Sequence, residues 1–237
     1  MKILIIGGAT TRTMRAHWAA HELGLDYESQ LIGSRTGETQ TKEFLALNPK
    51  AKIPVLSHDG LVLTESAAII YYLDQVAGSF NTAAGSLPSA AGALPTAAGA
   101  LPTAAGAPLI PTEPQTLARY QEWQSYILME LDAQTLYIMR KHGDLAHIYG
   151  EAPVAMETAR TGFNFQVKAA ASALESTPFL LGDSFSGVDI LLTTVLDWAV
   201  AYDFTLADSL LSYLERIQTR GAYISARAHN FSKPAPS

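Results

Sequence analysis

The chain has 237 residues, and its hydrophobic fraction of 48% is enough to bury a sizeable core in one large domain or two small ones. Lys and Arg total 16 against 22 Asp and Glu, a net charge of -6, and no five basic residues cluster, so nucleic acid is not an expected partner. The chain has no cysteine, which excludes disulfides, Cys-ligated metal sites and a protein thiol nucleophile.

The start of the chain, MKILIIGG, predicts a buried strand rather than a signal peptide, because the apolar run is short and no cleavage site follows it. No apolar stretch reaches the roughly 18 residues that a membrane-spanning helix needs. We therefore expect a cytoplasmic protein with no membrane partner.

The first third of the chain alternates between strand and helix patterns. Apolar runs, helical spacing and Gly or Pro stops predict these elements in order: strand 2–6, helix 11–23, strand 27–32, helix 42–47, strands 53–57 and 61–64, and helix 65–76. Asp59-Gly60 between the last two strands predicts a hairpin, so these strands are expected to be antiparallel. The predicted order is β-α-β-α-β-β-α.

A seven-residue repeat rich in Ala, Gly and Pro occupies residues 83–112. Gly and Pro in each unit disfavour a regular helix, and seven residues are too few for a solenoid unit. We interpret 81–112 as a repeat linker between a first domain at 1–80 and a second at 113–237. An ordered flap over a neighbouring pocket is the competing interpretation.

The sequence of the second domain predicts helices only. Helical spacing favours helices over 117–141, 153–174 and 186–201, with shorter ones at 206–217 and 223–228. Ser186 and Asp189 have the spacing of a capping box, and Phe185 that of a hydrophobic staple, at the start of a helix that is apolar on most sides. This pattern predicts a structural helix start and no catalytic role.

The strongest chemical signal lies in two segments, NPKAKIPVL at 48–56 and TESAAI at 64–69. A cis bond before Pro54 would turn the backbone and leave the N–H and C=O of Ile53 open to an extended peptide ligand. Ser66 begins the next helix, so its amide and hydroxyl suit a ligand carboxylate, while Glu65 would face a ligand ammonium.

Together and in this order, these segments resemble the two halves of the glutathione site in the glutathione S-transferase family. The resemblance covers residues 1 to about 80 and 108 to about 228. It implies a thioredoxin-like α/β N-terminal domain followed by an all-α C-terminal helical domain, in a cysteine-free, bacterial-type enzyme with glutathione as co-substrate. Ala51 stands where the family usually has glycine.

The resemblance assigns a role to each residue of the motif. It implies that Ile53, with Pro54 after it, holds the cysteinyl backbone of glutathione. Glu65 and Ser66 would hold the γ-glutamyl end, and Lys52 would lie close to the glycyl carboxylate.

The group that stabilises the thiolate lies between the first strand and the first helix in this family. That stretch has none of the usual Tyr, Cys or Ser residues here. Thr11 followed by Arg12 stands where many bacterial members have a Ser-Arg pair, and Thr10 is the other candidate. We expect one of the two threonines to cap the helix, and both remain candidates for the thiolate contact.

The second substrate is expected to be a small electrophile held between the domains. Tyr126, Ala133 and Tyr137 have the spacing of one helix face, and aromatic rings suit an apolar or aromatic substrate. The alternative is that this stripe packs on the following helix. Because no protein thiol is present, conjugation, substitution or lyase-type detoxification chemistry is predicted.

The resemblance also implies a homodimer formed through the third and fourth helices. These helices carry large side chains of a kind enriched at interfaces: Tyr71, Tyr72, Tyr120 and Trp123. We expect two of the four to belong to the core of the subunit.

The sequence disfavours two other classes of function and leaves a third open. Gly7-Gly8 does not satisfy Gly-x-Gly-x-x-Gly, which disfavours a nucleotide-binding oxidoreductase. His17 and His21 have a zinc-like i,i+4 spacing, but no third ligand is apparent, so no metal is expected. A non-catalytic glutathione S-transferase fold that serves as a binding or assembly module remains the main alternative, because the usual thiol-activating residue is missing.

Overall fold

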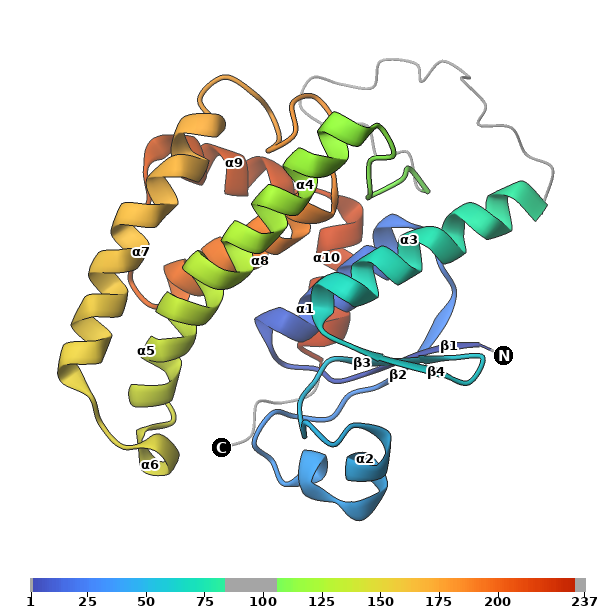
Figure 1. Cartoon of the computed structure of the whole chain (residues 1–237), viewed down its shortest axis with the longest axis horizontal. Coiled ribbons are helices and arrows are strands. Elements are labelled where there is room, and N and C mark those ends of the chain that lie inside the picture. The colour runs from blue at the N-terminus through green and yellow to red at the C-terminus, as the bar shows by residue number, and fades with distance from the viewer. Residues whose placement is uncertain (1, 84–105, 233–237) are drawn as a thin grey trace. The chain divides into compact units, whose positions relative to one another are not determined.

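The computed structural model describes residues 2–83 and 106–232 (Figure 1). The chain forms two compact units: one contains the residues up to Ile110 and those from Arg216 onward, and the other spans Pro111–Glu215. The last helix therefore belongs with the first unit. Most of the repeat lies at 84–105, outside the described residues, so the linker and the domain boundaries drawn from it stay predictions.

The first unit is built on a four-stranded sheet with the order β2-β1-β3-β4. Its strands are β1 (Ile3–Ile6), β2 (Tyr27–Gln30), β3 (Val55–His58) and β4 (Leu61–Thr64). β1 is parallel to β2, with Ile3 opposite Tyr27, and antiparallel to β3. β3 and β4 form the antiparallel hairpin that the sequence predicted at Asp59-Gly60. The predicted order of strands and helices is confirmed.

Helices cover both faces of the sheet (Figure 1). On one face, α1 (Thr11–Glu22) and α3 (Ser66–Ala83) pack against each other. On the other face, α2 (Lys42–Leu47) follows the short 3-10 helix η1 (Glu38–Gln40). α2 contributes Phe44 to a small core with Ile6 and Val55, and Leu47 packs against the same cluster.

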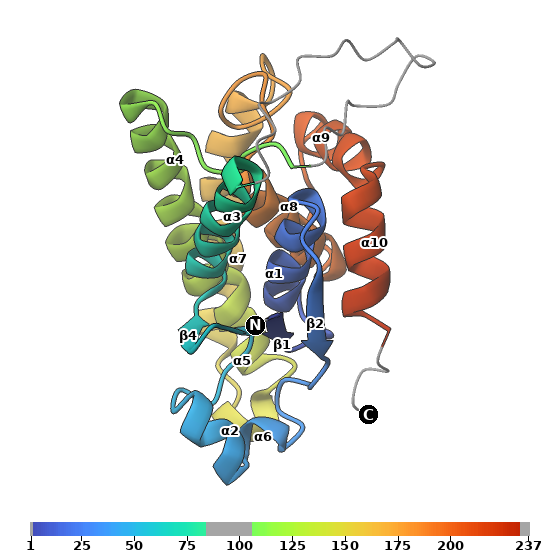
Figure 2. The same ribbon diagram turned by 90° about the vertical axis from the view of Figure 1, so that its right-hand side faces the viewer.

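The last helix, α10 (Gly221–Asn230), packs along α1, as Figure 2 shows. Tyr223 meets Trp18 edge-on with the ring centroids 5.0 Å apart. At the start of α10, Arg220 donates two hydrogen bonds of 2.7 Å to the carboxylate of Glu22, and both side chains are buried. A bidentate pair of this kind fixes the direction of α10 as well as its contact with α1.

The second unit is helical. Its helices are α4 (Pro114–Tyr126), the π-helix η2 (Ile127–Leu136), α5 (Tyr137–His142), α6 (Ala146–Tyr149), α7 (Pro153–Ala173), α8 (Gly187–Ala201) and most of α9 (Asp208–Gln218). The predicted capping box of α8 is confirmed. The carboxylate of Asp189 accepts hydrogen bonds from the amides of Leu180 and Ser186 and from the hydroxyl of Tyr213. Even so, complete burial raises the pKa of Asp189 to about 6.

The long helix predicted over 117–141 differs from the observed one in its winding. α4 passes directly into the π-helical stretch Ile127–Leu136 and then into α5, with the Tyr137 amide donating to the carbonyl of Asp132 five residues earlier. A π-turn takes up more residues than an α-turn, so the 3.6-residue spacing used for the sequence prediction does not hold across this stretch.

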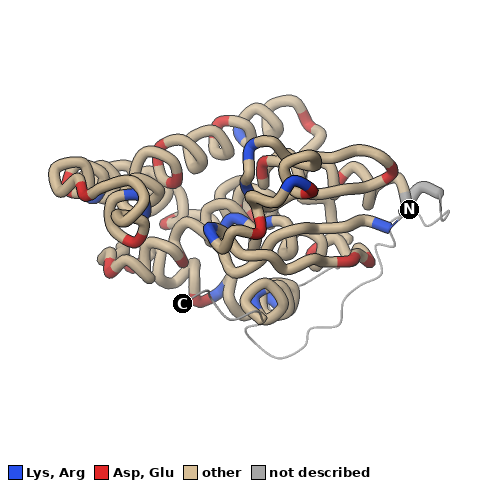
Figure 3. The backbone as a smooth tube through the Cα atoms, turned by 90° about the horizontal axis from the view of Figure 1, so that it is seen from below, with Lys and Arg blue, Asp and Glu red and all other residues tan. Residues whose placement is uncertain are grey.

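The surface carries both signs of charge. Figure 3 shows Lys and Arg interspersed with Asp and Glu along the described chain. Among the described residues, no helix is both long enough and apolar enough to span a membrane.

Candidate active site

The end of β1 brings Ile53 next to the start of α1. Ile53 precedes Pro54 through a cis peptide bond, as the sequence suggested. Gly7 follows β1 with φ +124°, and an added Cβ would lie 2.8 Å from the Cβ of Ile53 and 2.7 Å from Cγ2 of Thr13. Glycine is therefore required here for close approach as well as for its backbone conformation.

The backbone of Ile53 is open. Its N–H and C=O make no hydrogen bond to any other residue in the part of the chain that the structure describes. Since β3 begins only at Val55, the backbone of Ile53 projects beyond the sheet ladder. An extended peptide ligand can pair with these two groups as a short added strand.

Glu65 and Ser66 form the start of α3. Glu65 has φ +72°, a left-handed conformation that is uncommon for a residue with a side chain and that clusters at functional sites. Its carbonyl accepts the first helical hydrogen bond, from Ile69 at 3.0 Å. The backbone amides in the first turn of α3 have no acceptor within the helix, so they can donate to an anionic ligand.

Arg15 supports Ser66 from behind. This arginine is 1% exposed and donates a 3.3 Å hydrogen bond to the hydroxyl oxygen of Ser66. Because the Ser66 oxygen accepts from Arg15, its own proton remains to be donated to a second acceptor such as a ligand carboxylate. The sequence reasoning missed Arg15, since nothing local distinguishes it from other helix arginines.

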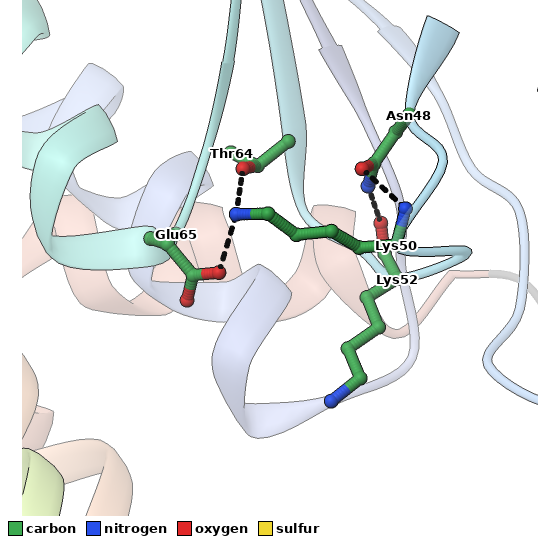
Figure 4. A network of polar contacts seen from close by, with 5 residues as sticks. All are labelled: Asn48, Lys50, Lys52, Thr64 and Glu65. Atoms are coloured by element: carbon green, nitrogen blue, oxygen red, sulfur yellow. Dashed lines mark hydrogen bonds and ion pairs between the residues drawn. The ribbon is translucent and has the colours of Figure 1, made fainter. Parts of the chain in front are cut away.

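An ammonium group already lies at Glu65 (Figure 4). Nζ of Lys50 is 3.0 Å from Glu65 Oε1 and 2.8 Å from the hydroxyl of Thr64. These two oxygen atoms thus form a pair of acceptors that holds a primary ammonium, which is the group that the amino end of glutathione presents. The Lys50–Glu65 pair is exposed, so its displacement by a ligand costs little.

Asn48 makes two hydrogen bonds within the loop that carries Lys50 and Lys52 (Figure 4). Its amide nitrogen donates to the carbonyl of Lys52 at 2.7 Å, and its amide oxygen accepts from the N–H of Lys50 at 3.1 Å. Within the loop, Ala51 has φ +54°, which explains why glycine is the usual residue there. In Figure 4 the side chain of Lys52 points in a different direction from that of Lys50, which reaches Glu65.

The candidate hydroxyls differ in their hydrogen bonds. Thr10 is the N-cap of α1, with its hydroxyl accepting from the Thr13 amide at 3.0 Å, so the expected capping threonine is Thr10. The hydroxyl of Thr11 makes no hydrogen bond to another described residue. Thr11 and Arg12 are the first two residues of α1, where the helix dipole favours an anion.

Comparison with known proteins matches two parts of the chain to one family. Residues 4–75 match the glutathione S-transferase N-terminal domain, and residues 127–215 match the glutathione S-transferase C-terminal domain. The chain belongs to the glutathione S-transferase family. The predicted fold class, the glutathione S-transferase activity and glutathione as co-substrate are thereby confirmed at the level of the family.

Individual members of the glutathione S-transferase family resemble the chain to different extents. Glutathione S-transferase 1 of Dianthus caryophyllus is 44% identical over 61 residues, which cover 26% of this chain and only 28% of that protein. Glutathione S-transferase U19 of Arabidopsis thaliana is 27% identical over 192 residues, which cover 80% of this chain and 69% of that protein. The glutathione-bound theta class enzyme of Xanthomonas axonopodis pv. citri has the same fold, with a TM-score of 0.71, 21% identity and full coverage of both chains.

The residues predicted to bind the electrophilic substrate, Tyr126 and Tyr137, lie in the second unit. The hydroxyl of Tyr126 donates to the backbone carbonyl of Gln166 at 2.5 Å, so Tyr126 contacts α7. Tyr137 has the ammonium of Lys141 over its ring at 5.1 Å. The π-helical stretch separates the two tyrosines, so a shared face for Tyr126, Ala133 and Tyr137 stays a prediction.

His17 supports the site from beneath Gly7. Its Nε2 lies 2.9 Å from the carbonyl oxygen of Gly7, which can only accept, so Nε2 carries the proton and Nδ1 accepts from the hydroxyl of Tyr27 at 3.1 Å. Burial, together with neighbouring His229 and His21, lowers the pKa of His17 to about 4, although the hydrogen bond to Gly7 opposes the shift. No group of three potential metal ligands occurs among the described residues, and the ring of His17 contacts Gly7 and Tyr27.

This buried histidine predicts a pH-dependent stability. In the unfolded chain His17 binds a proton below about pH 6.5, whereas in the folded chain it does so only near pH 4, so the folded state loses stability as the pH falls through that window. The loss is at most about 3 kcal/mol. In His17→Gln the amide can still donate to Gly7 without titrating, so urea unfolding at about pH 7 and about pH 4.5 should show a clearly smaller loss than in the wild type. Equal losses in the two proteins would assign the acid sensitivity to other groups.

Proposed function

We propose that this protein is a glutathione transferase in which the thiolate of bound glutathione attacks a small apolar or aromatic electrophile. The observation that carries the proposal is the convergence at Gly7, where the open backbone of Ile53 and the first turn of α1 meet. A peptide ligand paired with Ile53 would place its side chain beside that helix start. For glutathione this side chain is the cysteinyl thiol.

The start of α1 has the properties needed to favour a thiolate. A free thiol with a pKa of about 8.5 is only a few per cent ionised near neutral pH. The positive end of α1, the charge of Arg12 and a hydroxyl donor would each lower that pKa. Because Thr10 is engaged in the cap, we propose Thr11 as the hydroxyl that meets the thiolate and Thr10 as the second candidate.

We propose the remaining assignments of the glutathione site from the family resemblance, and the position of Lys50 at Glu65 supports one of them. Ile53 and Pro54 would bind the cysteinyl backbone, and Lys52 would lie near the glycyl carboxylate. Glu65 and Ser66 would bind the γ-glutamyl ammonium and carboxylate, in the place where Lys50 now supplies an ammonium.

The chain has no thiol of its own, so it cannot form a mixed disulfide with glutathione. We therefore propose conjugation, substitution or lyase-type chemistry, in which the thiolate adds to the electrophile or displaces a leaving group. Tyr126 and Tyr137 are the proposed aromatic contacts for that substrate.

We also propose a homodimer. Tyr120 is buried, and Tyr72 is half-buried with its hydroxyl paired to His58, so we assign these two to the interior of the subunit. Tyr71 is 50% exposed, and Trp123 lines an open groove of about 1220 Å³ between α4 and α7. Exposed aromatic side chains are typical of interfaces, and the mass of the protein in solution tests this assignment.

Thr11→Val tests the thiol chemistry, because it keeps the shape of the side chain and removes the hydroxyl. We expect the pKa of bound glutathione to rise by about one unit and turnover to fall roughly tenfold, with glutathione affinity nearly unchanged. Epoxides, aryl halides and benzylic ethers form the assay panel, and ultraviolet absorbance follows the thiolate.

Thr10→Val is the matched control. It removes the N-cap hydroxyl and should cost about 1 kcal/mol of stability, with a smaller effect on the bound thiol. If neither variant changes the thiolate absorbance, backbone amides or Arg12 carry the activation and the assignment to Thr11 is wrong.

A further inference from the structure

Asn230, the last residue of α10, lies at the start of α1 although 217 residues separate it from Thr13. It is fully buried and meets this segment through three hydrogen bonds. The backbone amide of Ala9 donates to the Asn230 carbonyl at 2.8 Å. The hydroxyl of Thr13 donates to Oδ1 of Asn230 at 2.7 Å, and Nδ2 of Asn230 donates to the carbonyl of Thr10 at 3.1 Å.

The chemistry of these contacts fixes the orientation of the Asn230 amide. The carbonyl of Thr10 can only accept, so Nδ2 must face it, and Oδ1 is left for the hydroxyl of Thr13. The Thr13 proton is thereby directed towards Asn230. The Thr13 oxygen is then free to accept from the hydroxyl of Thr10, 2.9 Å away.

In this arrangement the hydroxyls of Thr10 and Thr13 form hydrogen bonds within the protein, which leaves Thr11 as the third threonine of the segment. Thr10 receives the Thr13 amide and donates to the Thr13 hydroxyl, so both belong to a closed network that ends on Asn230. Thr11 is outside this network. Without Asn230, the Thr13 proton would turn to the carbonyl or hydroxyl of Thr10, and the capping turn would lose its fixed arrangement.

The backbone before the helix depends on the same residue. Ala9 has φ +56°, a conformation that persists in non-glycine residues only where the surroundings hold it, and its N–H is held by the Asn230 carbonyl. A Cβ added at Gly8 would lie 3.2 Å from the carbonyl oxygen of Asn230, so the segment before α1 and the end of α10 approach each other closely. Asn230 thus contacts each side of the capping turn.

We propose that Asn230 is a positioning residue for thiol activation: it orders the hydroxyl protons of Thr10 and Thr13 and holds the first turn of α1, so that Thr11 is presented to the glutathione sulfur. This inference rests on the proposed function and adds to it a residue from the far end of the chain. Asn230 acts through the turn and does not itself touch the ligand.

Asn230→Ala tests the proposal by removing both side-chain hydrogen bonds while leaving the backbone bond to Ala9. The pKa of bound glutathione should rise by about one unit and kcat should fall about tenfold, with KM for glutathione changed less than about twofold. In the ligand-free protein, exchange of the Thr10 and Thr13 amides should become faster by roughly tenfold. Asn230→Asp, which keeps the shape, should raise the thiol pKa further because it places a buried negative charge near the thiolate.

Tyr223→Leu is the matched control, since it weakens the packing of α10 on Trp18 without touching the capping turn. It should lower stability and leave the thiol pKa at the wild-type value. If the wild type lowers the pKa of the bound thiol and both Asn230 variants give the same thiol pKa as the wild type, this inference is wrong and the proposed function stands. It is also wrong if Tyr223→Leu shifts the thiol pKa as far as Asn230→Ala does. If the wild type shows no depression, the proposed function fails and the inference fails with it.

Discussion

Replacing Glu65 by alanine is expected to weaken glutathione binding by roughly 30-fold, or about 2 kcal/mol. The ligand ammonium would lose its charged acceptor and would face only the hydroxyl of Thr64. Both Glu and Ala must adopt φ +72° at this position, so the difference between them reflects the side chain and not the backbone. Isothermal titration calorimetry with glutathione measures the change.

Three further variants make this result specific. Glu65→Gln keeps an acceptor and removes the charge, so it should weaken binding by a smaller factor than alanine does. Lys50→Met removes the ammonium that occupies Glu65 and should tighten binding slightly, since an exposed pair is worth less than about 1 kcal/mol. Glu28→Ala removes another exposed glutamate of an ion pair in the same unit and should change nothing. An affinity of Glu65→Ala equal to that of Glu28→Ala would place the γ-glutamyl end elsewhere.

The largest effect on stability is expected for Arg220→Ala. It would leave the carboxylate of Glu22 buried without its bidentate partner, with only the indole N–H of Trp18 donating to it at 2.9 Å among its described side-chain contacts. Loss of one partner from a buried pair typically costs 3–5 kcal/mol, so we expect a loss of about that size. Urea unfolding monitored by tryptophan fluorescence measures it, because Trp18 lies beside the pair.

An exposed ion pair with nearly the same N–O distance shows whether the loss of stability comes from burial or from the contact distance. Arg119 and Glu122 are 2.6 Å apart, as close as the buried pair, but both side chains are more than half exposed. Arg119→Ala should therefore cost less than about 1 kcal/mol. The double variant Glu22→Leu with Arg220→Leu should recover much of the stability lost in Arg220→Ala. Equal losses in Arg220→Ala and Arg119→Ala would contradict the account of α10 as a helix anchored by a buried charge pair.

Local patterns in the sequence were sufficient for most elements of the first unit. The Asp59-Gly60 turn predicted the β3–β4 hairpin, and the short apolar run before Gly7 predicted β1, because in both cases the determining residues are neighbours in the chain. The spacing of Ser186 and Asp189 predicted the start of α8 for the same reason. Ile53-Pro54 and Glu65-Ser66 were proposed as a site because the two segments occur together and in that order, and the assignment of these residues stays a prediction.

The features that sequence reasoning missed depend on contacts between distant segments. Nothing in the sequence around Asn230 or Arg220 indicates that α10 packs on α1, some 200 residues earlier. The π-helical stretch at Ile127–Leu136 has no local signal either, since its residues also suit an α-helix. The choice between Thr10 and Thr11 as the cap was open because both are good N-cap residues, and only the backbone of the folded chain decides it.

The ionisation of bound glutathione is the most direct test of thiol activation at the start of α1. An ultraviolet pH titration of the wild-type complex should give a thiol pKa about one to two units below the value of about 8.5 expected for a free thiol. Binding together with that depression would establish that the start of α1 stabilises the thiolate. Binding with the pKa of the free thiol would contradict the account and leave a glutathione-binding module without thiol activation.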